Sequence, residues 1–239
     1  MKGVILAGGT GSRLWPLTKV VNKHLLPVGR HAMIEFALYK CKEAGVEDIL
    51  VITGQQDAGA IIGLLGGGEG YRVSLTYRVQ DRPGGIAHAM ALAESFAGGE
   101  PLLVLLGDNV FEDSLAESVA TFEQEKVSAK LFLKEVDDAS RFGVPVLHEG
   151  VLTWIEEKPQ VPKSSYAVTG IYMYDASVFD IIRRMRPSVR GELEITDVNN
   201  ALLQQSTVMY EVLHGWWTDA GTFESLWNAN QLARDVNFQ

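Results

Sequence analysis

The sequence predicts an α/β fold: one Rossmann-like domain over residues 1–239, with a mostly parallel central sheet flanked by helices and an added antiparallel part. Short apolar runs alternate with longer amphipathic stretches up to about residue 125, and a glycine-rich turn follows the first run. Beyond residue 126, strand-like runs follow one another closely. Repeated β-α-β units are typical of a parallel sheet with helices on both faces, whereas closely spaced strands favour antiparallel pairing.

The first half of the chain predicts four strands and three helices. Uncharged apolar runs bounded by turns indicate buried strands, and the run 102–106 consists of Leu and Val alone. Apolar residues three or four positions apart indicate helices, as in 33–44, where Gly45 follows as a stop signal. The expected strands are 3–7, 49–53, 73–77 and 102–106, and the expected helices are 33–44, 57–65 and 86–96.

The second half predicts strands first and helices afterwards. Four strand-like runs are separated by short turns, so we expect antiparallel strands beside the parallel sheet. No linker, internal repeat or low-complexity tract divides the chain, which favours one continuous domain. The expected strands are 127–136, 143–147, 151–156 and 168–174, and the expected helices are 177–185, 194–205 and 222–236.

The composition excludes several classes of protein. Apolar residues make up 46% and charged residues 21% of the 239 positions, as in ordinary globular domains. A net charge of −9 lacks the basic footprint of nucleic-acid binding. The longest aliphatic run, 102–106, is far shorter than the about 20 residues of a membrane helix. With one cysteine, Cys41, and no expected signal peptide, we expect a cytoplasmic protein without an intrachain disulfide.

The turn after the first strand reads Gly8-Gly9-Thr10-Gly11-Ser12-Arg13-Leu14. Glycines let backbone N–H groups approach phosphate oxygens, and Arg13 adds a fixed positive charge. The run lacks the Gly-Lys-Ser/Thr ending of a P-loop, and Leu14 stands where the dinucleotide fingerprint needs a third glycine. We interpret this turn as a phosphate-binding loop; the alternative is a simple flexible turn.

Further charged residues follow predicted strands or stand in turns. Lys23 could hold a phosphate as a point charge, and Asp108, after an apolar strand, is well placed to hold Mg²⁺ on a nucleotide. Each has a common structural alternative, which is a solvated lysine, an Asp-Asn turn or a helix cap. Glu157 and Lys158 could bind a polar ligand and its phosphate, and the alternative is a solvated turn. Arg190 precedes a helix start whose acids, Glu192 and Glu194, are more simply helix-capping than catalytic. Asp219 could be a ligand or a cap of the final helix.

Other chemistries lack their residue patterns. The five histidines show no metal-ligand spacing, and we expect His88 and His214 to be ordinary polar or packing residues. No Gly-x-Ser-x-Gly nucleophile elbow is present. Cys41 falls on the apolar face of a predicted helix, which favours a core position over a role as nucleophile.

Taken together, these segments resemble the sugar nucleotidyltransferases, and among them the short bacterial type that uses dTTP and glucose 1-phosphate. The resemblance extends from Lys2 to about Asn230 and rests on nine segments in the same order. One glycine loop would be a weak signal, but nine ordered segments are a specific one. They are Gly3–Leu14, Lys23 with Leu25–Val28, Gln80–Ala89, Leu106–Phe111, Phe142–Val144, Glu157–Pro159, Ala167–Tyr172, Arg190–Asn199 and Trp217–Thr222.

The resemblance implies that an oxygen of glucose 1-phosphate attacks the α-phosphorus of dTTP, which gives dTDP-glucose and pyrophosphate with Mg²⁺ as cofactor. It also implies that residues 1–125 mainly bind nucleotide, that residues 126–239 mainly bind sugar phosphate and close the fold, and that the protein is a homo-oligomer, commonly a tetramer. By position, the resemblance assigns the nucleotide to Leu6, Gly8, Gly9, Thr10, Gly11, Arg13, Lys23, Gln80, Pro83, Gly85 and Asp108. It assigns the sugar phosphate to Asn109, Gly143, Glu157, Lys158, Val168 and Arg190. The catalytic cations would be Arg13, Lys23, Lys158 and Arg190, and Mg²⁺ would be held by Asp108 and Asp219.

Physical reasoning agrees with such a reaction. Phosphoryl-type transfer depends mainly on positioning and charge neutralisation, and a phosphate that is already ionised needs no general base. Two anionic substrates in line need cations at both ends of the path. Arg13 and Lys23 could serve one end, and Lys158 and Arg190 the other.

Three other functions stay open at this point. His24 and His88 stand where members of this family usually carry glutamine, so the base preference is less secure and UTP could replace dTTP. A nucleotide-sugar glycosyltransferase shares the general α/β plan, although Gly107-Asp108-Asn109 offers no Asp-x-Asp. A non-catalytic ligand sensor would bind the same molecules without turnover.

Overall fold

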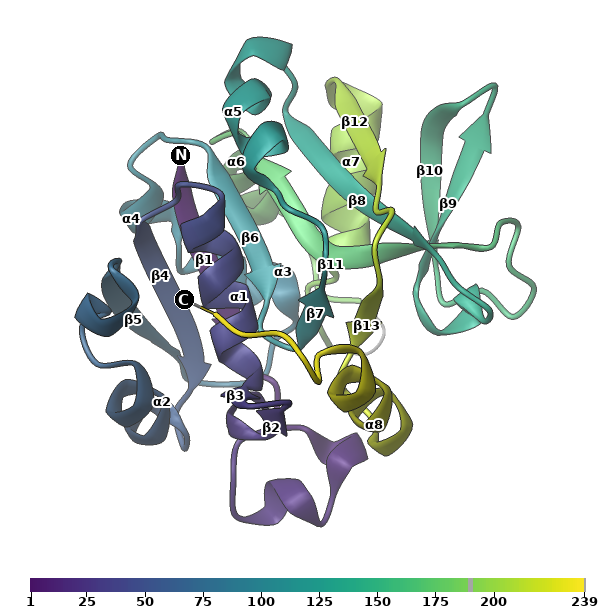
Figure 1. Cartoon of the computed structure of the whole chain (residues 1–239). Coiled ribbons are helices and arrows are strands. Elements are labelled where there is room, and N and C mark those ends of the chain that lie inside the picture. The colour runs from purple at the N-terminus through teal and green to yellow at the C-terminus, as the bar shows by residue number, and fades with distance from the viewer. Residues whose placement is uncertain (189–190, 239) are drawn as a thin grey trace.

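The structure, a computed structural model, describes residues 1–188 and 191–238. A nine-stranded sheet runs through the molecule (Figure 1). Its central path has the order β10-β9-β11-β6-β1-β4-β5, while β8 pairs with β11 and β12 pairs with β8. The strands are β1 (Lys2–Ala7), β4 (Asp48–Gly54), β5 (Ser74–Gln80), β6 (Leu102–Leu106), β8 (Ala129–Glu135), β9 (Gly143–His148), β10 (Val151–Glu157), β11 (Tyr166–Tyr174) and β12 (Val208–Val212).

The first half of the chain forms the parallel part of the sheet. β1 pairs in parallel with β4 on one side and β6 on the other, and β4 pairs in parallel with β5. The interiors of β1, β4 and β6 are apolar because both of their faces are covered, and Val4, Ile5 and Val104 have no exposed surface. All four carboxyl ends therefore lie at one edge of the sheet, where the loops after β1, β5 and β6 meet.

The second half extends the sheet mainly with antiparallel strands. β11 pairs antiparallel with β6, β8 and β9, and β10 pairs antiparallel with β9. β12 is an exception, because it lies parallel to β8. The predicted fold class, a mostly parallel sheet with an added antiparallel part, is thus confirmed.

Seven of the eight α-helices in the described ranges cover the two faces of the sheet, and the last one packs instead with Val28 and Phe36 in a separate apolar cluster. Apolar side chains of α1, α2 and α5 pack with Ile5 and Val51 on one face. Those of α3, α4, α6 and α7 pack with Val4 and Leu50 on the other. The helices are α1 (Met33–Glu43), α2 (Ala58–Leu65), α3 (Ile86–Ala91), α4 (Glu94–Ala97), α5 (Ala116–Glu125), α6 (Val178–Arg184), α7 (Ile195–Gln205) and α8 (Phe223–Leu232).

Two small sheets complete the architecture. β7 (Asn109–Phe111) pairs antiparallel with β13 (Trp217–Asp219), and β2 (Pro27–Val28) pairs antiparallel with β3 (His31–Ala32). The β7–β13 pair joins the segment after β6 to the segment before α8, which lie far apart in the sequence (Figure 1). This pairing brings two predicted site segments together.

Some expectations about individual elements were wrong. The single helix expected at 86–96 is divided into α3 and α4 by a turn at Leu92-Ala93. The helix α5 and the strand β12 were not predicted. The final helix is capped by the hydroxyl of Thr222, which accepts a hydrogen bond from Ser225 N at 3.2 Å, so Asp219 is not its cap. No helix in the described ranges has the length and apolar character to cross a membrane.

Candidate active site

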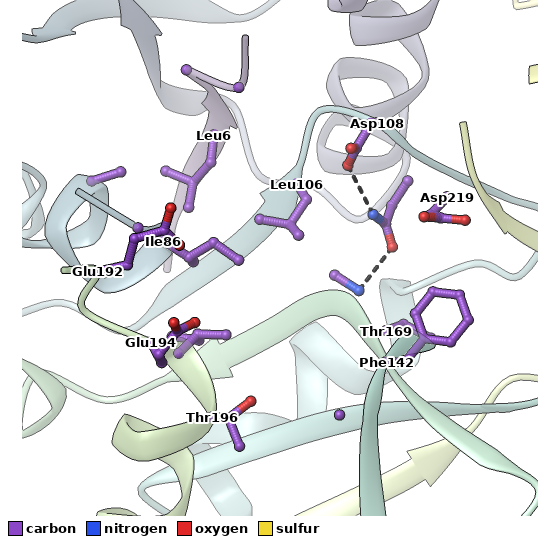
Figure 2. A pocket seen from close by; sticks show the side chains of 18 of the residues that line it. Leu6, Ile86, Leu106, Asp108, Phe142, Thr169, Glu192, Glu194, Thr196 and Asp219 are labelled. Carbon is purple, nitrogen blue, oxygen red and sulfur yellow. Dashed lines mark hydrogen bonds between the residues drawn. The ribbon is translucent and has the colours of Figure 1, made fainter. Parts of the chain in front are cut away.

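A cavity of about 740 Å³ opens at the carboxyl edge of the parallel strands (Figure 2). Of the residues predicted for the site, only Gly11 and Arg190 are not among those that line it; Arg190 lies outside the described residues. The structure thus brings segments from both halves of the chain to one place. The predicted residues that line the cavity are Leu6, Gly8, Gly9, Thr10, Arg13, Lys23, Gln80, Pro83, Gly85, Asp108, Asn109, Gly143, Glu157, Lys158, Val168 and Asp219.

The glycine-rich loop lies against two side chains of the site, those of Gln80 and Lys23. A Cβ atom at Gly9 would come within 2.8 Å of Lys23 Cε, so only glycine lets the lysine cross the loop at this point. Gly11 has a φ of 67°, in the left-handed region that favours glycine, and turns the chain into the short helix Ser12–Leu14. Leu14 is fully buried and anchors this helix.

Arg13 lies between the loop and the second aspartate segment. A Cβ atom at Gly221 would lie 2.8 Å from Arg13 Nη2 and 3.7 Å from Asp108 Oδ2. The guanidinium therefore packs on the backbone of Gly221, close to Asp108. The β13–α8 connection thus helps to fix a cation that the sequence placed with the glycine loop.

Lys23 and Asp108 form a close ion pair in the cavity. Lys23 Nζ lies 2.5 Å from Asp108 Oδ2, and the two side chains are only 11% and 13% exposed. The alternative of a solvated surface lysine is therefore wrong. Burial alone would raise the pKa of the Asp108 carboxyl, but the charge of Lys23 and hydrogen bonds from Lys23 and Asn109 hold it well below its usual range.

Asn109 fixes the strand end that carries Asp108. Its Nδ2 donates to Asp108 Oδ1 at 3.1 Å, and its Oδ1 accepts from Gly170 N at 2.8 Å (Figure 2). The same oxygen accepts from Trp217 Nε1 at 2.8 Å. Asn109 is buried and thus ties together β7, β11 and β13.

Asp219 faces the same cavity as Asp108. The β7–β13 register places Asp219 opposite Asn109, and Ala220 N donates to Asp108 O at 2.8 Å. Figure 2 shows the carboxyl groups of Asp108 and Asp219 at one end of the cavity. Burial, and next the negative charge of Asp108, raise the pKa of Asp219 to about 6. Arg141 lies 4.0 Å away and offsets this only in part.

His24 lies beside this ion pair and is 1% exposed. Its backbone N–H and its ring Nδ1 both contact Asn22 Oδ1 at 2.8 Å, so Nδ1 carries the ring proton. Burial, and next the charge of Lys23, lower the pKa of His24 to about 3. The imidazole is therefore neutral and supports the Lys23 segment through Asn22.

Glu157 and Lys158 stand where β10 ends at the cavity. Lys158 Nζ lies 2.8 Å from Glu157 Oε1, and Thr196 Oγ1 donates to Glu157 Oε2 at 2.6 Å. A Cβ atom at Gly143 would lie 3.7 Å from Glu157 Oε2, so the carboxylate borders the open backbone of that glycine. A carboxylate and an ammonium next to exposed backbone can bind hydroxyl and phosphate groups of a polar ligand.

Several lining residues were missed by sequence reasoning. Arg141 precedes the Phe142–Gly143 segment, and that position is the signal that could have found it. Thr196 lines the cavity from α7. Glu192 and Glu194 were interpreted as helix-capping acids; they line the cavity, opposite the two aspartates in Figure 2, and Glu194 makes no side-chain cap.

Comparison with known proteins agrees with this site. The family described as "Nucleotidyl transferase" matches residues 2–236. The glucose-1-phosphate thymidylyltransferase of Neisseria meningitidis is 41% identical over 240 residues, which cover 99% of this chain and 83% of that protein. The low-salt glycan biosynthesis nucleotidyltransferase Agl11 of Haloferax volcanii is 42% identical over 234 residues, which cover 97% of this chain but 66% of that longer protein.

Solved structures agree as well. A crystal structure from Bacillus anthracis, provisionally assigned as a glucose-1-phosphate thymidylyltransferase and in complex with sucrose, is 55% identical, has a TM-score of 0.97 and covers 100% of this chain and 97% of its own. A UDP-glucose pyrophosphorylase complexed with UDP-glucose is 25% identical, has a TM-score of 0.83 and covers 96% of this chain and 97% of its own. The cavity with its glycine loop and paired aspartates, together with a family match over 2–236, shows that this chain belongs to the nucleotidyl transferase family.

Proposed function

We propose that this protein joins dTTP to α-D-glucose 1-phosphate and releases dTDP-glucose and pyrophosphate. The observation that carries this proposal is the single cavity in which a glycine loop, two buried carboxylates and cations from both halves of the chain meet. A cavity of about 740 Å³ has room for both a nucleotide and a sugar phosphate. The relatives named glucose-1-phosphate thymidylyltransferase support the same substrates.

The nucleotide end of the cavity is assigned to residues 1–125. Backbone N–H groups of the loop from Gly8 to Gly11, together with Arg13 and Lys23, would hold the triphosphate. Lys23 already spans the loop and reaches Asp108, so it needs only a small displacement to meet a phosphate. Leu6, Gln80, Pro83 and Gly85 would enclose the base.

The sugar-phosphate end is assigned to residues 126–239, with Asn109 from the first half. Glu157 would accept hydrogen bonds from sugar hydroxyls, and Lys158 would neutralise the phosphate. Gly143 and Val168 would leave room for the ring. Arg190 keeps its proposed role toward the same phosphate.

Asp108 and Asp219 fit a divalent cation. They are two largely buried carboxylates at one end of the cavity, and the charge of Asp108 raises the pKa of Asp219. The described ranges contain no cluster of three or more His, Cys, Asp or Glu residues suited to a metal, so phosphate oxygens would complete the ligands. Mg²⁺ bound there would neutralise the donor phosphates and offset this repulsion.

The reaction requires no general base from the protein. A phosphate oxygen of glucose 1-phosphate forms a new bond to the α-phosphorus of dTTP while the bond to pyrophosphate breaks. The attacking oxygen is ionised, and His24 is neutral and buried, so no side chain has to remove a proton. Arg13, Lys23 and Lys158 align the two anions and stabilise the charge of the transition state.

Pyrophosphate release tests the proposal. The protein is mixed with each of four nucleoside triphosphates, several sugar 1-phosphates and Mg²⁺. We expect release to require dTTP, glucose 1-phosphate and Mg²⁺ together. If no pair releases pyrophosphate, the proposal is wrong. Competition between dTTP and UTP decides the base, since one methyl group discriminates by only about 1 kcal/mol. Transfer of glucose from dTDP-glucose to an acceptor would instead indicate a glycosyltransferase.

Substitution of the aspartates separates an enzyme from a ligand sensor. We expect Asp108→Asn and Asp219→Asn to lower turnover by about 10²–10³ at a temperature where circular dichroism shows each variant folded. Asp108→Asn also leaves Lys23 without its partner, so its stability is measured alongside. Asp235→Asn is the matched control, because Asp235 is exposed and outside the cavity. A sensor would show altered binding with no turnover to lose.

We also propose that the protein is a cytoplasmic homo-oligomer, as a tetramer. The buried, unpaired thiol of Cys41 suits a reducing compartment. Size-exclusion chromatography with light scattering measures the mass, and a monomer at micromolar concentration would contradict the tetramer.

A further inference from the structure

His88 lies behind the wall of the cavity and contacts a residue that lines it. Its ring Nδ1 lies 2.8 Å from Nε2 of Gln80, which ends β5, is buried and faces the cavity. An amide nitrogen only donates hydrogen bonds, so Nδ1 of His88 must accept this one. The neutral ring therefore carries its proton on Nε2.

The contact with His88 fixes the direction of the Gln80 amide. The second N–H of the same Nε2 is directed to Gly85 O, at 3.4 Å. The carbonyl oxygen points the other way, because a Cβ atom at Gly8 would lie 2.8 Å from Gln80 Oε1. Gln80 thus presents an acceptor, and not a donor, beside the start of the glycine loop.

The position of the His88 ring is itself determined by close packing. A Cβ atom at Gly84 would lie 2.6 Å from His88 Nδ1, so the ring packs directly on this glycine. Gly84 O in turn accepts a hydrogen bond from Leu193 N at 2.8 Å. On α3, Ala87 and Ala89 are buried on either side of His88. The ring is therefore held by backbone on one side and by its helix on the other.

We propose that His88 is a positioning residue that makes the site select bases with an N–H at the position facing Gln80. This inference rests on the proposed function, since it assumes that the base of the nucleotide meets Gln80. Thymine and uracil carry a proton on N3 and can donate to Gln80 Oε1. Cytosine carries a lone pair on N3, so two acceptors would face each other. The carbonyl oxygen of Gln80 would then stay without a hydrogen bond.

Without an acceptor at position 88, only the longer contact of Nε2 with Gly85 O, at 3.4 Å, opposes a half-turn rotation of the Gln80 amide. Its NH₂ group would then face the cavity and could donate to N3 of cytosine. Leucine at position 88 fills similar space but offers no acceptor. Glutamine at position 88 offers an amide oxygen that can accept from Gln80 Nε2. The two substitutions therefore separate hydrogen bonding from packing.

Binding of dTTP and dCTP to the full chain, measured by calorimetry, tests the inference without requiring turnover. We expect His88→Leu to lower the ratio of dTTP to dCTP affinity by about tenfold, the effect of about one hydrogen bond. We expect His88→Gln to keep the ratio of the unsubstituted protein. His148→Leu is the control, because His148 is exposed at the end of β9 and outside the cavity.

Three results would overturn the inference: an unchanged ratio in folded His88→Leu, the same loss in His88→Gln as in His88→Leu, or no binding of dTTP to the unsubstituted protein. If His88→Leu does not fold, ¹⁵N NMR of the unsubstituted protein decides, because a proton on Nδ1 of His88 contradicts the contact. The first two results leave the proposed function standing, since it is read from pyrophosphate release, whereas the absence of dTTP binding would overturn both. A chain that shows the expected binding ratios but releases no pyrophosphate keeps the role of His88 and loses the reaction.

Discussion

The ammonium of Lys23 lies 2.5 Å from the carboxylate of Asp108, although 85 positions separate the two residues in the sequence. Each group is buried, and each is the nearest opposite charge of the other. A buried charge without a partner is strongly destabilising, so the two residues depend on one another for stability. Both are also assigned to the reaction, which links the stability of the fold to the proposed chemistry at one point.

Replacing Lys23 with methionine should affect stability and activity together. Because the carboxylate of Asp108 loses its partner while still buried, we expect a loss of about 3–5 kcal/mol in the free energy of unfolding. Turnover should fall by about 10²–10³, since a phosphate contact is lost as well. Urea unfolding and pyrophosphate release measure the two effects. Lys163→Met is the control, because Lys163 is 67% exposed and its pairing with Glu156 is weak.

Replacing Asp219 with asparagine should stabilise the metal-free protein. Burial and the charge of Asp108 raise the pKa of Asp219 from 3.8 to about 6, so its ionised form is less stable in the folded protein than in the unfolded chain. Stability is therefore lost as the pH rises from 3.8 through about 6. At neutral pH the gain of Asp219→Asn should be about 2–3 kcal/mol, because one pKa unit is worth about 1.4 kcal/mol.

Urea unfolding in the presence of a chelator, repeated across this pH range, measures the effect of Asp219→Asn. We expect the gain to shrink as the pH falls and to vanish below the usual pKa of the carboxyl. A variant that is less stable than the unsubstituted protein at neutral pH would contradict the assigned environment of Asp219. Asp235→Asn, at an exposed position, should leave the curve unchanged.

The sequence alone predicted the elements whose pattern is local. Strands β1, β4 and β6 have apolar interiors because both faces are buried, and such runs are easily distinguished. Helix α5 was missed because Phe122 is its one buried apolar side chain. Its other buried residue, Ser118, donates a hydrogen bond to Glu211 at 2.5 Å, a contact that no periodicity could indicate.

The site was predictable where a motif is contiguous and unpredictable where it depends on tertiary contacts. The glycine loop and the Asp108 turn are short segments with a recognisable pattern. Local sequence does not distinguish a solvated lysine from Lys23, whose partner Asp108 lies in the distant turn between β6 and β7. The same holds for Trp217, which donates to Asn109 across 108 positions of sequence. Arg141 lines the site because β9, the strand that follows it, pairs with β11, which no local pattern indicates.

His24 should make the protein sensitive to acid. Burial lowers its pKa from 6.5 to about 3, so the unfolded chain takes up a proton in this range while the folded protein does not. Above pH 6.5, His24 does not lower the free energy of unfolding. As the pH falls from 6.5 toward 3, the free energy of unfolding decreases by up to about 1.4 kcal/mol per pH unit. We expect His24→Gln to have a shallower decline of the urea midpoint with falling pH. An equal slope in both proteins would show that His24 is protonated in the folded state, and His148→Gln should not change the slope.

Glu157 should govern the affinity for the sugar phosphate and leave the nucleotide unaffected. Its Oε2 accepts from Thr196 at 2.6 Å and its Oε1 contacts Lys158 at 2.8 Å, so the carboxylate both faces the sugar and orients a cation. Hydrogen bonds to charged groups contribute about 1.5–3 kcal/mol, so Glu157→Gln should raise the KM for glucose 1-phosphate by about 10- to 100-fold. Binding that is equal in the ground state and the transition state changes KM and not kcat, so kcat and the KM for dTTP should stay nearly constant.

Steady-state kinetics with each substrate varied in turn measures this effect of Glu157→Gln. The neighbouring Glu156→Gln, which loses only a contact with Lys163 at 3.6 Å, should behave as the unsubstituted protein. A rise in the KM for dTTP of the same size would place Glu157 at the nucleotide and would contradict the assignment.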